Sequence, residues 1–394
     1  MNPVFTIALS LLAVSLLVYL VQFLCVFHHT RRQRLSSTAL AEPISIVKPL
    51  CGYIEGLEEN LESFTLLNYP LYEIILGVKS PDDSALPAAR AFQKRHPNLP
   101  IKIVINNRQY GYNPKVNNLV PMMTQAAHDL VLISDDNVRV EKNYLRDTVA
   151  EMSDSVGLVY NLIRGTGAAK LGAILENLHL NSFIAGSVCF LHKVMHHPCV
   201  IGKSMLFRRS ALQRIGGFDA VRNVLAEDYL LGKYFQRRGY RVTLCSHGIS
   251  NVNVNWSLRR FVSRHARWAK MRFWIGTYQY ASEWLGNPVA CAVIAFAMQP
   301  SFLFAALFAM IGVVKIILDR MIARRLGAKM PLQHFLLTPL KDLLIALIWF
   351  APFINRTIRW REKKYTLGLG SRLWPFEEKQ FEEATAIEPL PVLS

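Results

Sequence analysis

The apolar residues of this chain are concentrated towards its two ends, and the middle alternates between short apolar runs and amphipathic stretches. Residues 5–27 contain no charged side chain. As a helix this segment would be roughly 34 Å long at about 1.5 Å per residue, enough to cross a bilayer. A basic cluster at residues 31–34 follows it, and no small-residue cleavage site is present, which predicts an uncleaved anchor. The positive-inside rule places the chain after this anchor in the cytoplasm.

The middle of the chain has the pattern of an α/β domain. Apolar runs of strand length alternate with stretches of helical period, which predicts a mostly parallel, Rossmann-like sheet with helices on both faces. Strands are predicted at 44–47, 72–78, 101–105, 130–133 and 157–161, and helices at 57–67, 86–95, 144–152, 226–238 and 258–273. Gly165, Thr166 and Gly167 are expected to form a loop too short for a phosphate cradle.

The run 130–133 leads directly into Asp135, Asp136 and Asn137. Ligands of open α/β sheets bind beyond the carboxyl ends of the strands, where these side chains would stand. Oxygen ligands suit Mg²⁺ or Mn²⁺, so Asp135 and Asn137 are predicted metal ligands. The alternative is an Asx turn that only ends a strand.

A second candidate site is the turn before a predicted helix at Asn113 and Pro114. Asn113 is a favourable N-cap, and proline is favoured at the first helical position. Lys115 and the amides of this helix N-terminus would suit a phosphate group. An ordinary capped helix fits the same residues, and the pattern alone does not separate the two.

Two later segments carry further candidate residues. Asp228 follows Glu227 at the start of a predicted helix, and two adjacent acids are more than a cap requires. Arg264 lies three residues before Arg267 and four residues before Trp268, so all three share a helix face. Two guanidinium groups beside an indole could hold diphosphate oxygens and pack on a sugar or acceptor. A basic helix anchored at a membrane by Trp268 is the alternative.

The remaining apolar segments divide the chain as follows. The stretch 171–195 is apolar but interrupted by polar residues, which predicts a helix lying at the membrane surface. The block 289–318 is long for one span, and 335–354 contains Lys341 and Asp342, so the number of crossings stays open. We expect an anchor at 1–30, a basic linker at 31–43, the α/β domain at 44–284, a membrane region at 285–358 and a cytoplasmic tail at 359–394.

Charge and cysteine content indicate the cellular environment and the charge of the substrate. The formal net charge is +17, yet much of the excess flanks the apolar segments, which favours an anionic membrane surface over nucleic acid. The remaining positive charge can bind an anionic substrate such as a nucleoside diphosphate. The six cysteines form no C-x-x-C pair, as expected in a reducing compartment. No protein partner can be inferred.

These motifs together resemble the ceramide glucosyltransferase family and its bacterial relatives, which are inverting glycosyltransferases with a GT-A fold. The family's second and third aspartates match Asp135 and Asp228, and its closing R-x-x-R-W motif matches Arg264, Arg267 and Trp268. The run Gly111 to Leu119, read as G-x-N-P-K-V-N-N-L, is the most specific match. Trp360, Arg361 and Tyr365 also resemble the family's C-terminal tail. One departure is that the first family aspartate falls on Ser80, with Asp82 and Asp83 close behind.

The resemblance implies transfer of a hexose, glucose from UDP-glucose, onto the hydroxyl of ceramide, giving a β-linked glycolipid. Asp228 would be the general base. Asp82 or Asp83 would contact the uridine, while Asp135, Lys115, Arg264, Arg267 and Trp268 would hold the rest of the donor with Mg²⁺ or Mn²⁺. The enzyme would lie in a bacterial inner membrane or in the Golgi membrane.

Three alternatives remain open from the sequence. The acceptor could be another lipid, such as a hopanoid. A processive polysaccharide synthase shares the R-x-x-R-W type of motif but needs more membrane helices than this chain has. A silent membrane protein that only binds a nucleotide sugar is compatible with Ser80.

Overall fold

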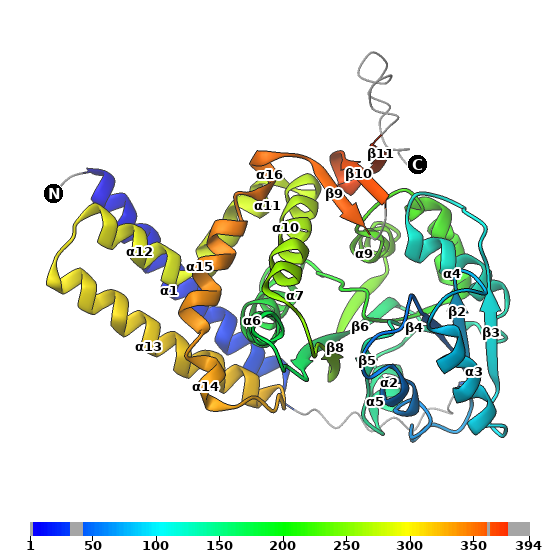
Figure 1. Ribbon diagram of the computed structural model, residues 1–394. Coiled ribbons are helices and arrows are strands. Elements are labelled where there is room, and N and C mark those ends of the chain that lie inside the picture. Colours follow the sequence, from blue (N-terminus) through cyan, green and yellow to red (C-terminus); the bar gives the residue numbers. More distant parts are fainter. Residues whose placement is uncertain (1–2, 32–41, 361–362, 377–394) are drawn as a thin grey trace, which may run out of the picture.

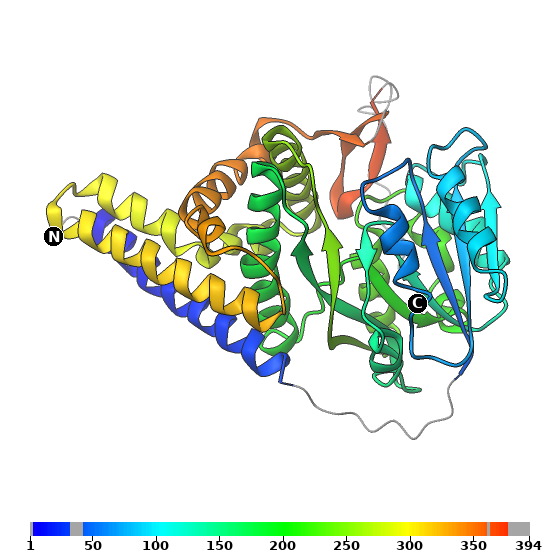
Figure 2. The same cartoon turned by 60° about the horizontal axis from the view of Figure 1, so that its bottom comes forward.

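A computed structural model describes residues 3–31, 42–360 and 363–376. Long apolar helices form one end of the molecule, an α/β layer forms the other, and a group of helices lies between them (Figure 1). Figure 2 shows the same three parts from a second direction. Most of the predicted basic linker and the tail beyond residue 376 lie outside the described residues.

The α/β layer is built on an eight-stranded sheet with the order β3-β2-β1-β4-β7-β6-β8-β5. Strands β1 to β4 are mutually parallel, β7 is antiparallel to its neighbours β4 and β6, and β8 is parallel to β6. The predicted mostly parallel sheet is therefore confirmed. The strands are β1 (Ile44–Pro49), β2 (Tyr72–Val78), β3 (Ile101–Ile105), β4 (Leu130–Ser134), β5 (Val138–Arg139), β6 (Val156–Thr166), β7 (Ser204–Arg208) and β8 (Arg241–Val252).

Helices cover both faces of this sheet because alternate residues of its strands point to opposite sides. On β4, Leu130 and Leu132 face one core, and Val131 and Ile133 face the other. The first core is closed by α2 (Leu57–Glu62), α3 (Leu86–Arg95) and α5 (Tyr144–Val149), and the second by α4 (Pro114–Thr124), α8 (Arg209–Arg214) and α9 (Glu227–Arg237).

Some details of the predicted elements were wrong. The helix predicted at 144–152 ends at Val149. The first helix ends at Glu62 instead of residue 67, and turns follow it. Gly165 and Thr166 belong to β6, because they pair with Asn251 and Val252 of β8 rather than forming a loop.

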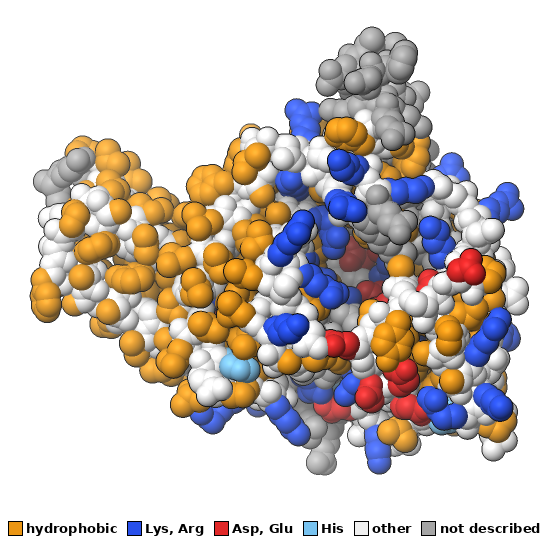
Figure 3. All heavy atoms as spheres, in the orientation of Figure 1, with side chains coloured by type: hydrophobic (Ala, Val, Ile, Leu, Met, Phe, Trp, Pro, Cys, Tyr) orange, Lys and Arg blue, Asp and Glu red, His pale blue; other side chains and the backbone are white. Residues whose placement is uncertain are grey.

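Among the described residues, three helical segments could cross a membrane by length and composition: α1 (Pro3–His29), residues 171–193 and α13 (Phe302–Arg325). The block 289–318 is broken by Gln299 to Ser301, so α12 (Pro288–Met298) and α13 form a hairpin. A bent pair of segments, 277–286 and 288–298, meets at 78° and could make a fourth span. Figure 3 shows an almost uncharged hydrophobic surface over this end of the molecule.

Residues 171–193 are helical but mostly enclosed by protein. They form α6 (Leu171–His179), a π-helical turn (Leu180–Ile184) and α7 (Ala185–Lys193). Of their most apolar window, 67% is buried inside the protein. The partners are mainly α1 and α10 (Leu258–Ile275). The predicted position at the membrane surface stays a prediction.

The charges within 335–354 are explained by pairing. That stretch is broken into α14 (Leu332–Phe335), α15 (Thr338–Ile348) and α16 (Ala351–Ile354). Lys341 and Asp342 of α15 form ion pairs with Asp319 and Lys315 of α13 at 3.6 and 3.4 Å. Within each helix the lysine also pairs with its own carboxylate, at 2.7 Å in α13 and 2.6 Å in α15. The Tyr19 hydroxyl of α1 donates to Asp319 at 2.6 Å. We call these four charged residues the membrane charge cluster.

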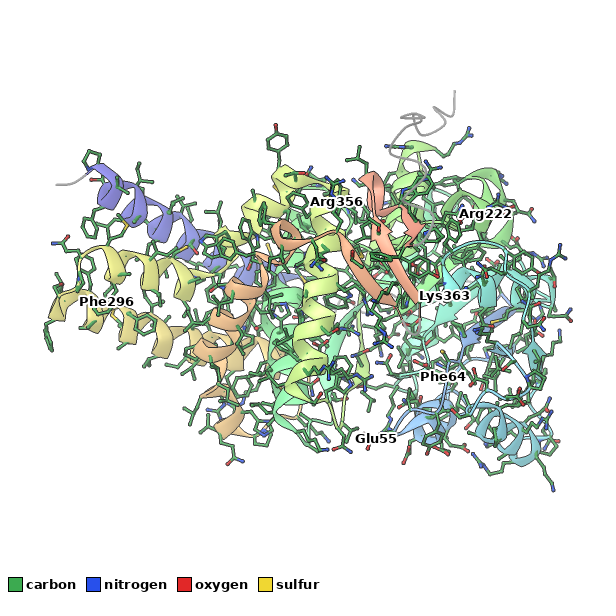
Figure 4. All side chains as sticks on the ribbon, turned by 45° about the horizontal axis from the view of Figure 1, so that its top comes forward. Glu55, Phe64, Arg222, Phe296, Arg356 and Lys363 are labelled. Atoms are coloured by element: carbon green, nitrogen blue, oxygen red, sulfur yellow. The ribbon has the colours of Figure 1, made fainter. Side chains whose placement is uncertain are left out.

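The chain closes with a small antiparallel sheet of β9 (Thr357–Trp360), β10 (Lys363–Leu367) and β11 (Leu373–Pro375). In Figure 4, where Arg356 and Lys363 are labelled, this sheet lies between α10 and the α/β layer. Its buried Tyr365 packs with Leu225, just before α9. The Leu225 amide also donates to the Ser371 carbonyl at 2.9 Å, so the C-terminal segment holds the start of α9 in place.

Candidate active site

The end of β4 holds a carboxylate between two lysines. Asp135 Oδ1 lies 2.9 Å from Lys115 Nζ, and Asp135 Oδ2 lies 2.9 Å from Lys203 Nζ. Burial alone would raise the pKa of Asp135, but the two ammonium groups outweigh it and hold that pKa well below its usual range. Lys48 Nζ also donates a hydrogen bond to the Asp135 backbone carbonyl at 2.9 Å, just after β4. Burial lowers the pKa of Lys48 to about 7, although Asp136 and Asp135 oppose the shift.

The predicted metal ligands do not fit a cation in this arrangement. Both oxygens of Asp135 accept from ammonium groups, and Asn137 Oδ1 accepts from Lys203 Nζ at 2.8 Å. Mg²⁺ needs such oxygens at about 2.0–2.1 Å in near-octahedral geometry. Among the described residues, no three His, Cys, Asp or Glu side chains are grouped to hold a metal. Metal binding at Asp135 and Asn137 thus stays a prediction, and no step below depends on it.

The run Gly111 to Leu119 has separate structural and candidate binding parts. Asn113 caps α4 as predicted, accepting from the amides of Lys115 and Val116, and its Nδ2 donates to Glu227 at 3.0 Å. Asn117 Oδ1 accepts from the Gly111 amide at 2.8 Å and so closes the preceding turn. Lys115 is the member that reaches the strand end. Burial opposes its charge, but Asp135 and Glu227 outweigh burial and raise its pKa.

Asp228 lies in the first turn of α9, partly exposed, while Glu227 beside it is buried. The amides of Gly202 and Tyr229 donate to the two Asp228 oxygens at 2.5 and 2.7 Å, which fixes the carboxylate. Burial raises the pKa of Asp228 although Lys115 opposes it. Burial also raises the pKa of Glu227, to about 7. A raised pKa and partial exposure are properties expected of a general base.

Residue 202 must be small because the backbone passes close to these charges. A Cβ atom at Gly202 would lie 2.8 Å from Asp228 Oδ2 and 2.9 Å from Lys115 Nζ. The Gly202 carbonyl also accepts from Lys115 Nζ at 2.8 Å. One short turn therefore orders both the carboxylate and the ammonium group.

The basic residues of α10 are held in different ways. Arg264 stacks on Trp268 at 4.2 Å, and its Nε lies 3.2 Å from Oε1 of the fully buried Glu176. His265 Nε2 contacts the other Glu176 oxygen at 2.7 Å. Arg267 makes no hydrogen bond or ion pair with the described residues. Burial and the neighbouring Arg264 lower the pKa of Arg267 to about 10, so it stays charged and available to an anion.

The two sets of charges face a common hollow. Arg260 of α10 and Asp136 after β4 are close enough for their charges to interact, as are Glu176 of α6 and Lys203. Figure 3 shows a hollow between α10 and the α/β layer, with blue basic side chains along its rim and red acidic ones deeper inside. We call this the charged cleft.

The positions of Asp82 and Asp83 give less support for a role in the charged cleft than those of Asp135 and Asp228. Asp83 Oδ1 accepts from the amides of Gly52 and Ala85 at 2.9 and 3.0 Å, which ties the end of β1 to the start of α3. Asp82 is exposed. Within the described part of the chain, neither forms a hydrogen bond or ion pair with Asp135. Their proposed contact with uridine stays a prediction.

Sequence reasoning missed several residues of the cleft. Lys203 and Lys48 gave no signal because their partners are distant in sequence, and Glu227 was noted only as the acid beside Asp228. Glu176 was visible only as an acid interrupting an apolar stretch. Its charge within an otherwise apolar helix was the available hint, since buried acids are rarely unpaired.

Most of the chain can be superimposed on a solved glycosyltransferase. The mannosyltransferase from Pyrobaculum calidifontis, solved in complex with GDP-Man and Mn²⁺, matches 88% of this chain and 98% of its own, with a TM-score of 0.55 and 17% sequence identity. The chain therefore has the GT-A fold, with apolar helices at both ends.

Sequence comparison gives the family. The model of glycosyl transferase family 21 matches residues 7–373, so the chain belongs to that family. Ceramide glucosyltransferase 1 of Caenorhabditis elegans is 28% identical over 92% of this chain and 81% of its own length. Ceramide glucosyltransferase 3 of the same organism is 25% identical over 84% and 74%. The chain is a membrane-associated hexosyltransferase.

Proposed function

We propose that this enzyme transfers glucose from UDP-glucose to the primary hydroxyl of ceramide, with inversion at the anomeric carbon. The observation that carries the proposal is Asp228, a partly exposed carboxylate fixed by two backbone amides and close to the Lys115, Asp135 and Lys203 cluster at the end of β4. The names of the family relatives support the lipid acceptor and the sugar. The nucleotide bound by the archaeal mannosyltransferase supports a nucleotide-sugar donor.

The chemistry is a single displacement. Asp228 takes the proton of the acceptor hydroxyl as its oxygen forms a bond to the anomeric carbon. The bond from that carbon to the phosphate oxygen breaks, and its electron pair leaves with the diphosphate. Arg264 and Arg267, together with the cleft lysines, stabilise the negative charge that develops there. Glu227 is buried against Asn113 and is therefore not placed as a nucleophile. A single displacement with Asp228 as base and no carboxylate nucleophile predicts a β-linked product.

The acceptor would approach from the membrane side of α10. A small cavity there is lined by Phe183, Trp284 and Trp349 together with His265. His265 and Arg264 share Glu176, which connects this apolar cavity to the phosphate side of the cleft. Trp268 would pack on the sugar or the acceptor, and Asp82 or Asp83 would contact the uridine. The cleft would open to the cytoplasm, in a bacterial inner membrane or a Golgi membrane.

A donor and acceptor panel tests the proposal. The detergent-purified full chain would be incubated with labelled nucleotide sugars and with ceramide or a hopanoid, and the product linkage would be read by NMR. We expect a β-linked glucosylceramide from UDP-glucose. A glycosylated hopanoid would show that the acceptor is a hopanoid and not ceramide. An α-linked product would exclude inversion. Nucleotide binding with no product from any donor would show that the protein only binds a nucleotide sugar.

A further inference from the structure

Lys203 is the cleft residue that the family motifs do not explain. It precedes β7 and faces the end of β4, where its ammonium group contacts Asp135 Oδ2 at 2.9 Å and Asn137 Oδ1 at 2.8 Å. Its side chain is 14% exposed, against 15% for Lys115 and 20% for Asp135. The three groups are thus ordered by one another yet reachable from the cleft.

The backbone fixes Lys203 in this position. The Asp135 amide donates to the Lys203 carbonyl at 3.3 Å, and the Lys203 amide donates to the Ile201 carbonyl at 2.7 Å. The next residue back, Gly202, donates its amide to Asp228. The segment that carries Lys203 is therefore joined both to the end of β4 and to the candidate base.

The two ammonium groups on Asp135 supply the two positive charges that a divalent cation would bring. Lys115 also lies 3.5 Å from Glu227, a carboxyl whose pKa burial raises to about 7. The lysines also use the lone pairs that a cation would need, both on Asp135 and on Asn137. A third cation here would be repelled by two ammonium groups less than 3 Å from its ligands.

We propose that Lys203 and Lys115 together bind the donor diphosphate and neutralise it as it leaves, so that transfer requires no divalent cation. This inference rests on the proposed function. In the displacement described above, the electron pair of the breaking bond goes to a phosphate oxygen, which accepts hydrogen bonds from the two ammonium groups. Asp135 holds both lysines in place and makes no contact with metal.

Nucleotide binding tests this without any turnover. UDP would be titrated calorimetrically into the full-length protein in excess EDTA and then in excess Mg²⁺, and Mn²⁺ would be followed by electron paramagnetic resonance with and without UDP. We expect the two UDP affinities to agree within about twofold and the Mn²⁺ signal to remain that of the free ion. UDP binding only with Mg²⁺, or UDP-dependent capture of Mn²⁺, would overturn the proposal.

A Lys203→Met variant sharpens the test. Loss of one charge-assisted hydrogen bond should weaken UDP binding about ten- to a hundredfold in EDTA. Because Asp135 and Asn137 then regain free oxygens, Mn²⁺ should restore part of that affinity. Lys203→Arg should keep binding independent of metal, and the exposed Lys94→Met of α3 is the matched control. Unchanged UDP affinity in Lys203→Met would contradict the proposal.

Transfer assays separate failure of this inference from failure of the proposed function. Glucosylceramide formed only when Mg²⁺ or Mn²⁺ is present would refute metal independence and leave the reaction standing. Absence of product in every condition, with UDP still bound in EDTA and lost in Lys203→Met, would refute the reaction and uphold the diphosphate site.

Discussion

The molecule holds two clusters of opposite charges that differ in balance and exposure. In the membrane charge cluster, two lysines face two carboxylates, and all four side chains are at most 5% exposed. At the end of β4, two lysines meet Asp135 and remain 14 to 15% exposed, and Lys115 also lies 3.5 Å from Glu227, a carboxyl whose pKa burial raises to about 7. Arg267 of α10 has no hydrogen-bond or ion-pair partner in the described part of the chain.

This difference indicates what each cluster does. Charges buried among apolar helices must be neutralised within the protein, because an unpaired ion is very costly there. The membrane charge cluster therefore joins α13 and α15, and its member Asp319 also accepts from Tyr19 of α1. The cleft lysines are partly exposed and are therefore available to an anionic substrate. Function and fold should thus respond differently to mutation of the two clusters.

The largest effect is expected for Asp228→Asn. The amide cannot accept the acceptor proton, so turnover should fall by about two to four powers of ten if Asp228 is the base. Stability should fall by about 1–3 kcal/mol, because only one of the two backbone amides that donate to Asp228 keeps its acceptor. Transfer rate and thermal unfolding would be measured together, with the exposed Asp219→Asn as control. Near-normal turnover in Asp228→Asn would remove this residue from the mechanism.

Breaking the membrane charge cluster should instead destabilise the fold. Asp319→Leu leaves Lys315 without its nearest carboxylate, which should cost about 3–5 kcal/mol of unfolding free energy. The double variant Lys315→Met, Asp319→Leu restores neutrality and should recover much of that loss. Unfolding in detergent would measure both. Full stability of the single variant combined with lost transfer would show that the cluster serves the reaction.

A smaller effect of pH should arise from Glu227. Its pKa is about 7, so it is mostly neutral below that pH and becomes charged as pH rises. Its oxygen lies 3.5 Å from Lys115 Nζ, so the charged form competes with the donor for that ammonium group. The donor KM should therefore rise a few-fold from about pH 6 to about pH 8. Glu227→Gln should flatten this dependence, and a profile identical to that of the wild type would exclude the competition.

The fold was predictable from sequence mainly where the pattern is local. Strands β2 and β3 and helix α3 have their predicted bounds because apolar period and turn residues define them directly. Asn113 caps α4 for the same reason. The extension of β6 depends on pairing with β8, which lies far along the chain.

The same limit applies to the charged cleft. Asp135, Asp228 and Arg267 could be selected because each ends a strand, starts a helix or shares a helix face with another candidate. Lys203 could not be selected, because its contact with Asp135 forms only when β4 pairs with β7. The pairing of Lys341 and Asp342 with α13 was hidden because helices distant in sequence form it.

The central claim is that the charged cleft is built for a nucleoside diphosphate, and a structure of the full chain with bound UDP tests it most directly. We predict that the diphosphate lies within hydrogen-bond distance of Lys115, Lys203 and Arg267, with Asp228 facing the space left for sugar and acceptor. UDP bound away from these side chains, with Lys203 still on Asp135 and Arg267 unpaired, would contradict the account.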